Sequence, residues 1–303
     1  MFAAPGSWSL KKCSNAQCGL LWLDPMPVPE DLSLAYEGYY THGEPERSPL
    51  SMLVKYVYQF IVSCTLFVAG IPQEKRRSAL MYLGNRSPGT LLDVGCGDGT
   101  FLATMAKRGW KVTGIDFDPL AVEAARTRYG LDVHVGTVGR LVEQGRQFDV
   151  VTASHVLEHV PDPIEFLSQC RQLLRPGGCL VLKTPNAESF GHRRYAGAWR
   201  GLEPPRHLHI FSLWALEHSA RRAGFSRCDA FTSFAGSGGM MVVSRFLARK
   251  GSFRMHELSG LDFFWARILE PLYALESRFV WLLDRRSGEE ICAVLAHEPD
   301  PAK

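Results

Sequence analysis

A glycine-rich stretch, residues 91–102, constrains the fold of this chain more than any other feature. It starts as a short apolar run typical of a buried parallel strand and continues through alternating glycines into residues that favour a helix: Leu-Leu-Asp-Val-Gly-Cys-Gly-Asp-Gly-Thr-Phe-Leu. Glycines leave bare backbone at the carboxyl end of a strand, where open α/β sheets bind their ligands. The stretch therefore predicts a strand, a ligand-binding loop and a helix.

The spacing of these glycines argues against a dinucleotide ligand such as NAD. A dinucleotide fingerprint would place its third glycine at position 100, which is Thr100 here. An acidic residue, Asp116, stands at the end of the next predicted strand, where a carboxylate can accept hydrogen bonds from both hydroxyls of a ribose. The loop and Asp116 together indicate a ligand that contains an adenosyl group.

Strand and helix patterns alternate from residue 90 onward, which predicts an α/β fold with helices on both faces of a parallel sheet. Further strands are expected at residues 111–115, 133–135, 148–153, 179–183 and 228–232. Three residues that favour helix N-caps, Asp118, Asp162 and Ser212, precede the helices between them. The long connection between the last two of these strands starts at residue 184, and loops of such length are usually functional.

The glycine loop and the segment Gly114-Ile115-Asp116 resemble the first two motifs of class I S-adenosylmethionine-dependent methyltransferases. Three other stretches resemble later motifs of that family: residues 154–160, 174–178 and 205–211. The resemblance implies a Rossmann-like sheet of seven strands with the last one antiparallel. It also implies S-adenosylmethionine as the cofactor and S-adenosylhomocysteine as its product.

The chain departs from this family pattern at both ends. We expect an N-terminal helical segment or lid (1–85), a cofactor-binding methyltransferase core (86–235), a helical insert (236–288), and the last strand with a tail (289–303). The family usually turns directly from strand six to strand seven, so the insert is a candidate for acceptor cover, dimer contact or membrane docking.

The resemblance also assigns residues that contact the cofactor. Asp93 matches an acid near the methionine amine, Phe117 could border the adenine, and Thr137 stands where the family often has an acid that touches the adenine amine. The predicted set is Asp93, Gly95, Cys96, Gly97, Gly99, Asp116, Phe117, Thr137, Ser154 and His155.

Histidines are the candidates for acid–base chemistry. Transfer of a methyl group from a sulfonium depends mainly on alignment, but a hydroxyl acceptor also needs a base with a pKa near neutral. Four histidines fall on predicted rim segments: His155, His159, His207 and His209. An extended segment alternates its faces, so we expect the last two to share one side, and we place them first as bases. A purely structural role, with the rings hydrogen-bonded to backbone, is the alternative.

A second alternative gives some of these histidines to a metal ion. His155, Glu158, His159 and one of His207 or His209 resemble the Glu-rich metal site of small-RNA terminal 2′-O-methyltransferases, with histidine in place of the first glutamate. Because related metal-free enzymes also contain the Leu-Glu-His sequence, we predict no metal. For Cys13 and Cys18, which resemble half of a zinc ribbon, we also expect no metal, since no second closely spaced pair follows.

Charge and composition narrow the class of acceptor. A formal net charge of +3, from 34 basic and 31 acidic residues, gives no electrostatic case for nucleic acid. We therefore expect methyl transfer to a small molecule, on oxygen rather than carbon. The segment 13–40 resembles part of some sugar and natural-product methyltransferases, which implies a sugar or natural-product intermediate as the acceptor. The alternatives are a metal-dependent RNA 2′-O-methyltransferase and a non-catalytic cofactor-binding scaffold at a membrane or partner.

Cysteine usage and hydropathy predict where the protein works. Eight scattered cysteines favour a reducing compartment, so we expect a cytoplasmic protein. We also expect the protein to be a monomer or a homodimer. The most apolar stretch, residues 56–71, is shorter than the ~20 apolar residues that a membrane-spanning helix needs. It is expected to form a buried or interfacial helix, which allows peripheral contact with a membrane.

Overall fold

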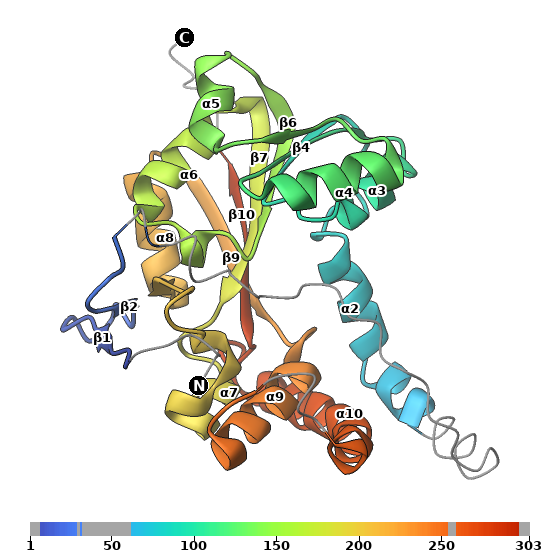
Figure 1. The fold of residues 1–303 in the computed structure, drawn as a ribbon, viewed down its shortest axis with the longest axis vertical. Coiled ribbons are helices and arrows are strands. Elements are labelled where there is room, and N and C mark those ends of the chain that lie inside the picture. The colour runs from blue at the N-terminus through green and yellow to red at the C-terminus, as the bar shows by residue number, and fades with distance from the viewer. Residues whose placement is uncertain (1–6, 29–30, 32–61, 254–258, 297–303) are drawn as a thin grey trace.

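The computed structural model describes residues 7–28, 31, 62–253 and 259–296, and its centre is a seven-stranded sheet (Figure 1). The strand order is β5-β4-β3-β6-β7-β10-β9. The bounds are β3 (Thr90–Val94), β4 (Lys111–Asp116), β5 (Val133–Val135), β6 (Phe148–Ser154), β7 (Leu174–Pro185), β9 (Arg227–Ser233) and β10 (Glu290–Ala296). The first five are parallel neighbours, and β10 runs antiparallel to both β7 and β9. The predicted Rossmann-like fold with a last antiparallel strand is confirmed.

Helices cover both faces of this sheet and form two separate cores. On one face α3 (Thr100–Ala106) and α4 (Pro119–Tyr129) bury Leu102, Met105 and Val122 against the strands. On the other face lie α5 (Val138–Glu143), α6 (Pro163–Gln172) and α8 (Leu213–Arg222). The strands between them carry apolar side chains on both sides, which is why the sequence showed continuous apolar runs rather than alternation.

The helix starts follow the predicted capping residues. The side chains of Asp118, Asp162 and Ser212 each accept a hydrogen bond from a backbone N–H in the first turn of α4, α6 and α8. Strand β7 differs from its prediction, because it starts at Leu174 and not at Cys179. Leu174 pairs with Phe148 across a register shift, so the glycine-containing turn is absorbed into the strand.

Within residues 7–28 the N-terminal segment forms a β-hairpin. Strands β1 (Leu10–Lys12) and β2 (Leu21–Leu23) pair antiparallel, and β2 pairs in turn with β8 (His209–Ile210). Strand β8 belongs to the long connection after β7, which also contains the short helix α7 (Phe190–Tyr195). Helical structure of the N-terminal segment is described from residue 62 and includes α2 (Ile71–Ala79); residues 32–61 lie outside the described part.

Two helices occupy the chain between β9 and β10, as predicted. They are α9 (Ser237–Lys250) and α10 (Gly260–Leu283), and they pack on each other at the end of the molecule opposite α5 (Figure 1). Helix α10 also contacts α2. Among the described helices, none combines the length and the apolar character needed to cross a membrane.

Candidate functional site

The glycine loop after β3 forms a backbone seat that opens on one side. Gly95, Gly97 and Gly99 all have left-handed backbones, with φ of 70°, 51° and 76°. A Cβ on Gly95 would lie 2.6 Å from the Val156 side chain, and one on Gly99 would lie 2.7 Å from Leu131. A Cβ on Gly97 would meet no atom within 4 Å. Packing therefore explains the outer two glycines, whereas Gly97 presents bare backbone to open space where a ligand can approach.

Asp116 closes this seat from the neighbouring strand. It is buried at the end of β4, and its two carboxylate oxygens accept the backbone N–H groups of Gly97 at 2.8 Å and Asp118 at 2.9 Å. Each oxygen retains a further lone pair, which fits the two ribose hydroxyls of an adenosyl group. Phe117 and Thr137 are exposed at the adjacent ends of β4 and β5, on the side where an adenine would extend. The residues present therefore fit S-adenosylmethionine.

Asp93 lies inside the same rim. It is buried on β3 and accepts a hydrogen bond of 2.7 Å from the Thr152 hydroxyl. Burial raises the pKa of this carboxyl to about 7, against the Thr152 hydrogen bond and the positive charge of Lys183, which lower it. A cationic ammonium group nearby would favour the ionised form. Cys96 is different, because its thiol points into the core toward Gly114, and so it can offer a ligand only its backbone.

His155 stands at the end of β6 between two carboxylates. Its Nδ1 is 3.0 Å from Glu158, its Nε2 is 2.8 Å from Glu290, and 40% of the side chain is exposed. Burial lowers the pKa of the imidazole, but the two carboxylates raise it more, so the pKa lies well above its ordinary value. The backbone φ of 55° is uncommon for a residue other than glycine, and such conformations cluster at functional sites. Sequence reasoning found His155 but missed Glu290.

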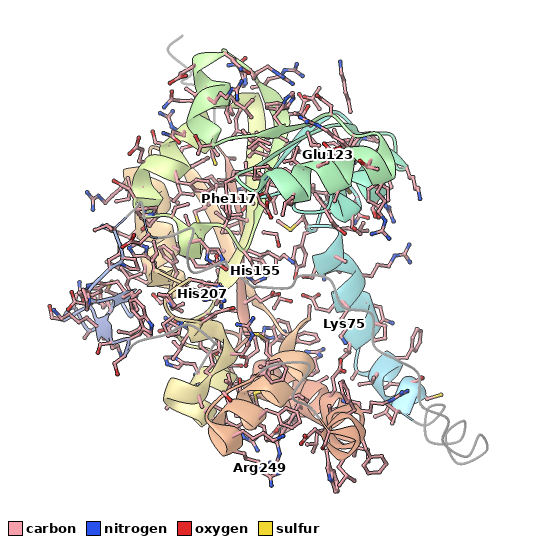
Figure 2. All side chains as sticks on the ribbon, viewed as in Figure 1. Lys75, Phe117, Glu123, His155, His207 and Arg249 are labelled. Atoms are coloured by element: carbon pink, nitrogen blue, oxygen red, sulfur yellow. The ribbon has the colours of Figure 1, made fainter. Side chains whose placement is uncertain are left out.

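Glu158 also belongs to a second group, with His159 and His207, in which Glu158 and His207 are buried. Figure 2 shows His207 near His155. One potential ligand atom from each of the three lies within 4.8 Å of the others. His207 Nδ1 is 2.7 Å from the Gly201 carbonyl, and burial lowers the pKa of this ring to about 4. Burial raises the pKa of Glu158, but the hydrogen bond from His155 and the nearby positive charges together outweigh it and lower the pKa to about 2. The group has the donor chemistry of a metal site, although Glu158 already accepts hydrogen bonds from His155 and Thr184.

His209 belongs to a different environment from His207. It lies in β8 opposite Trp22 of the N-terminal hairpin, and its ring is 6.1 Å from that of Phe211. Burial lowers its pKa, against a hydrogen bond with the backbone of Val160. Of the four candidate histidines, His155 is the one with the most exposed side chain at the strand ends.

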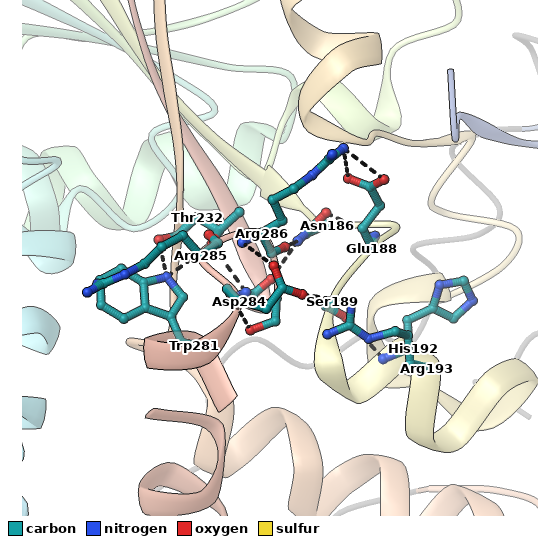
Figure 3. Close-up of polar contacts among 12 residues, drawn as sticks. Asn186, Glu188, Ser189, His192, Arg193, Thr232, Trp281, Asp284, Arg285 and Arg286 are labelled. Carbon is teal, nitrogen blue, oxygen red and sulfur yellow. Dashed lines mark hydrogen bonds and ion pairs between the residues drawn. The ribbon is translucent and has the colours of Figure 1, made fainter. Parts of the chain in front are cut away.

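The long connection after β7 is tied to the last strand and to the end of α10 (Figure 3). Asn186 donates to the carbonyls of Arg286 and Gly288 at 2.7 Å each. The fully buried Glu289 accepts the backbone N–H of Gly191 at 2.7 Å and the indole N–H of Trp199 at 2.8 Å. Burial raises the pKa of Glu289 to about 7. These contacts fix the segment that precedes Glu290, and so they hold the wall of the site next to His155.

Comparison with known proteins gives a consistent result. A family model described as a methyltransferase domain matches residues 70–227. The ubiquinone biosynthesis O-methyltransferase of Cereibacter sphaeroides is 31% identical over 218 residues, which cover 68% of this chain and 85% of that protein. The enzyme of the same name from Nitrosomonas europaea is 36% identical over 157 residues, 47% of this chain and 66% of its own.

One solved structure supports the fold. The chain is similar to a protein from a complex between the Haloferax volcanii Trm112 methyltransferase activator and a methyltransferase, with a TM-score of 0.50 and 16% identity. The match covers 83% of this chain and 100% of the other. At this identity the likeness concerns the architecture of the sheet and its helices alone.

Proposed function

Because the chain belongs to the S-adenosylmethionine-dependent methyltransferase family, we propose that it transfers the methyl group to a hydroxyl oxygen of a small molecule. The observation that carries this proposal is the pairing of Asp116 with the backbone of Gly97, which joins a ribose-binding carboxylate to the open glycine. Oxygen as the acceptor atom is supported by relatives named ubiquinone biosynthesis O-methyltransferase. Our first candidate for the acceptor is accordingly a hydroxyl-bearing intermediate of ubiquinone biosynthesis, ahead of a sugar or natural product.

The residues of the rim have distinct proposed roles. When bound, S-adenosylmethionine supplies a methyl group on a sulfonium that is already activated, so positioning provides much of the rate. Asp116 holds the ribose, Gly97 allows close approach of the cofactor, and Asp93 faces the amine of the methionine part. The remaining side chains of the site then have to act only on the hydroxyl of the acceptor.

We assign that chemistry to the group formed by Glu158, His155 and Glu290. The sequence placed His207 and His209 first, but His207 is buried against the Gly201 carbonyl and His209 lies in β8 opposite Trp22, which favours structural roles for both. His155 is a cation held between two anions, so it orients the carboxylates rather than acting as a free base. Burial raises the pKa of Glu290, but its contact with His155 lowers it more, so this carboxylate is ionised and is placed to orient the acceptor hydroxyl by accepting its hydrogen bond.

Cofactor binding tests the proposal directly. S-adenosylhomocysteine should raise the melting temperature of the wild-type protein, and Asp116→Ala should weaken its binding roughly 100-fold, because two charge-assisted hydrogen bonds are lost. Asp132→Ala, which removes an exposed acid before the start of β5, at the opposite end of the strands from Asp116, is the control and should bind normally. Absence of a shift in the wild type would contradict the proposal, and binding without transfer to any hydroxyl acceptor would favour the scaffold alternative.

A metal-dependent enzyme is the second candidate, because Glu158, His159 and His207 bring their ligand atoms together. If these residues hold a catalytic cation, EDTA should abolish transfer and Mn²⁺ or Mg²⁺ should restore it. Under the proposal above, transfer continues in EDTA. The same measurement on RNA ends and on small hydroxylated acceptors separates the RNA enzyme from the small-molecule enzyme.

A further inference from the structure

Helix α10 presents an apolar surface that no other described part of the chain covers. Its buried side, with Tyr273, Ala274 and Ser277, packs against α9, where Gly238 lets the two backbones approach closely. The opposite side is also apolar, and its side chains are between 43% and 75% exposed: Leu261, Phe264, Trp265, Leu272, Phe279, Leu282 and Leu283. A helix that is apolar on its solvent side as well as its core side is typical of a surface that binds something.

The same surface continues onto the residues before α2. Phe67 and Val68 are 64% and 88% exposed. Their neighbours Leu66 and Ala69 pack against a buried cluster that includes Ala274 of α10, and the Arg278 guanidinium donates to the carbonyl of Ala69 at 3.0 Å. We call the seven exposed α10 residues together with Phe67 and Val68 the apolar face. It therefore combines two segments that are far apart in the sequence.

Basic residues are concentrated on the two helices that pack against α10. Helices α2 and α9, which both contact α10, carry six lysines and arginines and one acid, Glu74, whereas α10 itself carries two arginines and three acids. Two of those acids form ion pairs with Lys75 and Lys250, and the three helices together keep an excess of positive charge. The six basic residues of α2 and α9 are Lys75, Arg76, Arg77, Arg245, Arg249 and Lys250. Figure 2 shows Lys75 and Arg249 on these two flanking helices. The positive charge excess is thus concentrated on the same group of helices that carries the apolar face.

We propose that the apolar face docks the protein on an anionic membrane surface. Aromatic and leucine side chains inserted at the boundary of headgroups and acyl chains, with lysines and arginines beside them, are the features that hold amphipathic helices in the plane of a bilayer. Helix α10 has 24 residues and so can lie along the surface for about 36 Å. A second copy of the chain fits less well, because paired apolar faces would bring the basic helices of both copies together.

Vesicle co-sedimentation of the full-length chain, without cofactor or acceptor, tests this proposal independently of enzymatic activity. We expect binding to vesicles that contain phosphatidylglycerol, weaker binding to pure phosphatidylcholine, and loss of binding as salt is raised. Trp265→Ser combined with Phe279→Ser should weaken binding roughly tenfold or more, because two exposed anchors are removed. Arg249→Glu should weaken binding to anionic vesicles alone.

Matched controls use residues at the other end of the molecule. Leu120 on α4 is 80% exposed, so Leu120→Ser removes an equally accessible apolar side chain, and Arg108→Glu reverses a charge beside α3. Both controls should bind vesicles as the wild type does. The proposal is overturned if the wild type does not bind, if the Trp265 and Phe279 double variant binds equally well, or if those substitutions instead dissociate a dimer seen by light scattering.

Discussion

At the scale of single residues, the site depends on side chains whose surroundings set their charge. His155 is strained in its backbone and held by two carboxylates, whereas His207 is buried and hydrogen-bonded to a carbonyl. The first environment favours the imidazolium and the second favours the neutral ring. Two histidines that look alike in the sequence therefore differ in charge at neutral pH.

Substitution of Glu290 tests the group around His155. The folded-state pKa of His155 is raised, so its favourable contribution to stability is complete below its ordinary pKa and is lost as pH rises through the folded value. In Glu290→Gln one of the two anions is gone, and we expect the His155 titration, followed by NMR, to move down by about one pH unit or more.

The same variant should lower kcat more than KM if Glu290 orients the acceptor hydroxyl for attack on the methyl group. Glu123→Gln, on the exposed side of α4, is the control and should leave both the titration and the rate unchanged. An unchanged His155 titration in Glu290→Gln would contradict the assignment of Glu290 as a partner of His155 in the site.

The glycine loop makes a second prediction at the residue scale. Gly97→Ala should cost the fold only about 1 kcal/mol, since its Cβ meets no protein atom and the penalty is that of the left-handed backbone. Binding of S-adenosylhomocysteine should nevertheless be lost. Gly99→Ala should destabilise the fold more, because its Cβ would overlap Leu131 and Ala125. Calorimetry and thermal melts of both variants would separate ligand access from packing.

At the scale of elements, the connection after β7 is held in place by the last strand. Glu289 supplies two hydrogen-bond acceptors to this connection from a fully buried position. Arg193 and Asp284 add an exposed ion pair of 3.1 Å between α7 and the end of α10. The buried hydrogen bonds of Glu289 should stabilise this connection more than the Arg193–Asp284 ion pair does, because surface ion pairs contribute little to stability.

The pH dependence of unfolding reports on this anchor. Burial raises the pKa of Glu289 from its ordinary value to about 7, so its ionisation destabilises the fold progressively as pH rises from about 4.5 through 7. Part of the wild-type stability should accordingly be lost between pH 5 and pH 8, as measured by urea unfolding. Glu289→Gln should remove that part of the slope, and an equally steep slope in the variant would contradict the assignment.

At the scale of the whole molecule, strand pairing joins segments that are far apart in the sequence. Strand β8 brings the N-terminal hairpin against the core, and β10 inserts between β7 and β9. Ser212 shows how one residue serves both purposes, since its hydroxyl caps α8 through Ala215 and also donates to the carbonyl of Cys18. Loss of such a residue affects a helix start and the docking of the hairpin together.

Ser212→Ala should therefore lower the free energy of unfolding by about 1–3 kcal/mol, the sum of a lost cap and a carbonyl left without its donor. Ser259→Ala removes the exposed cap of α10 and provides the comparison, with an expected loss of about 1 kcal/mol. Chemical denaturation of both variants measures the difference. Equal losses would mean that the contact with Cys18 contributes nothing.

The sequence by itself determined the parallel sheet, the glycine loop and the position of Asp116. These features depend on residues close together in the chain: apolar runs define strands, glycines define the loop, and the strand order of the fold brings Asp116 beside it. Capping residues likewise marked the starts of α4, α6 and α8, because a cap acts on the next three residues.

Only the tertiary structure decided which groups meet across long separations. His155 and Glu290 are 135 positions apart, and they touch because β10 lies next to β7 with its first residue at the rim. The burial of His207, the pairing of the hairpin with β8, and the exposure of one side of α10 have the same origin. Helical spacing reveals that a side chain is apolar, but the packing of neighbouring elements determines whether that side chain is covered.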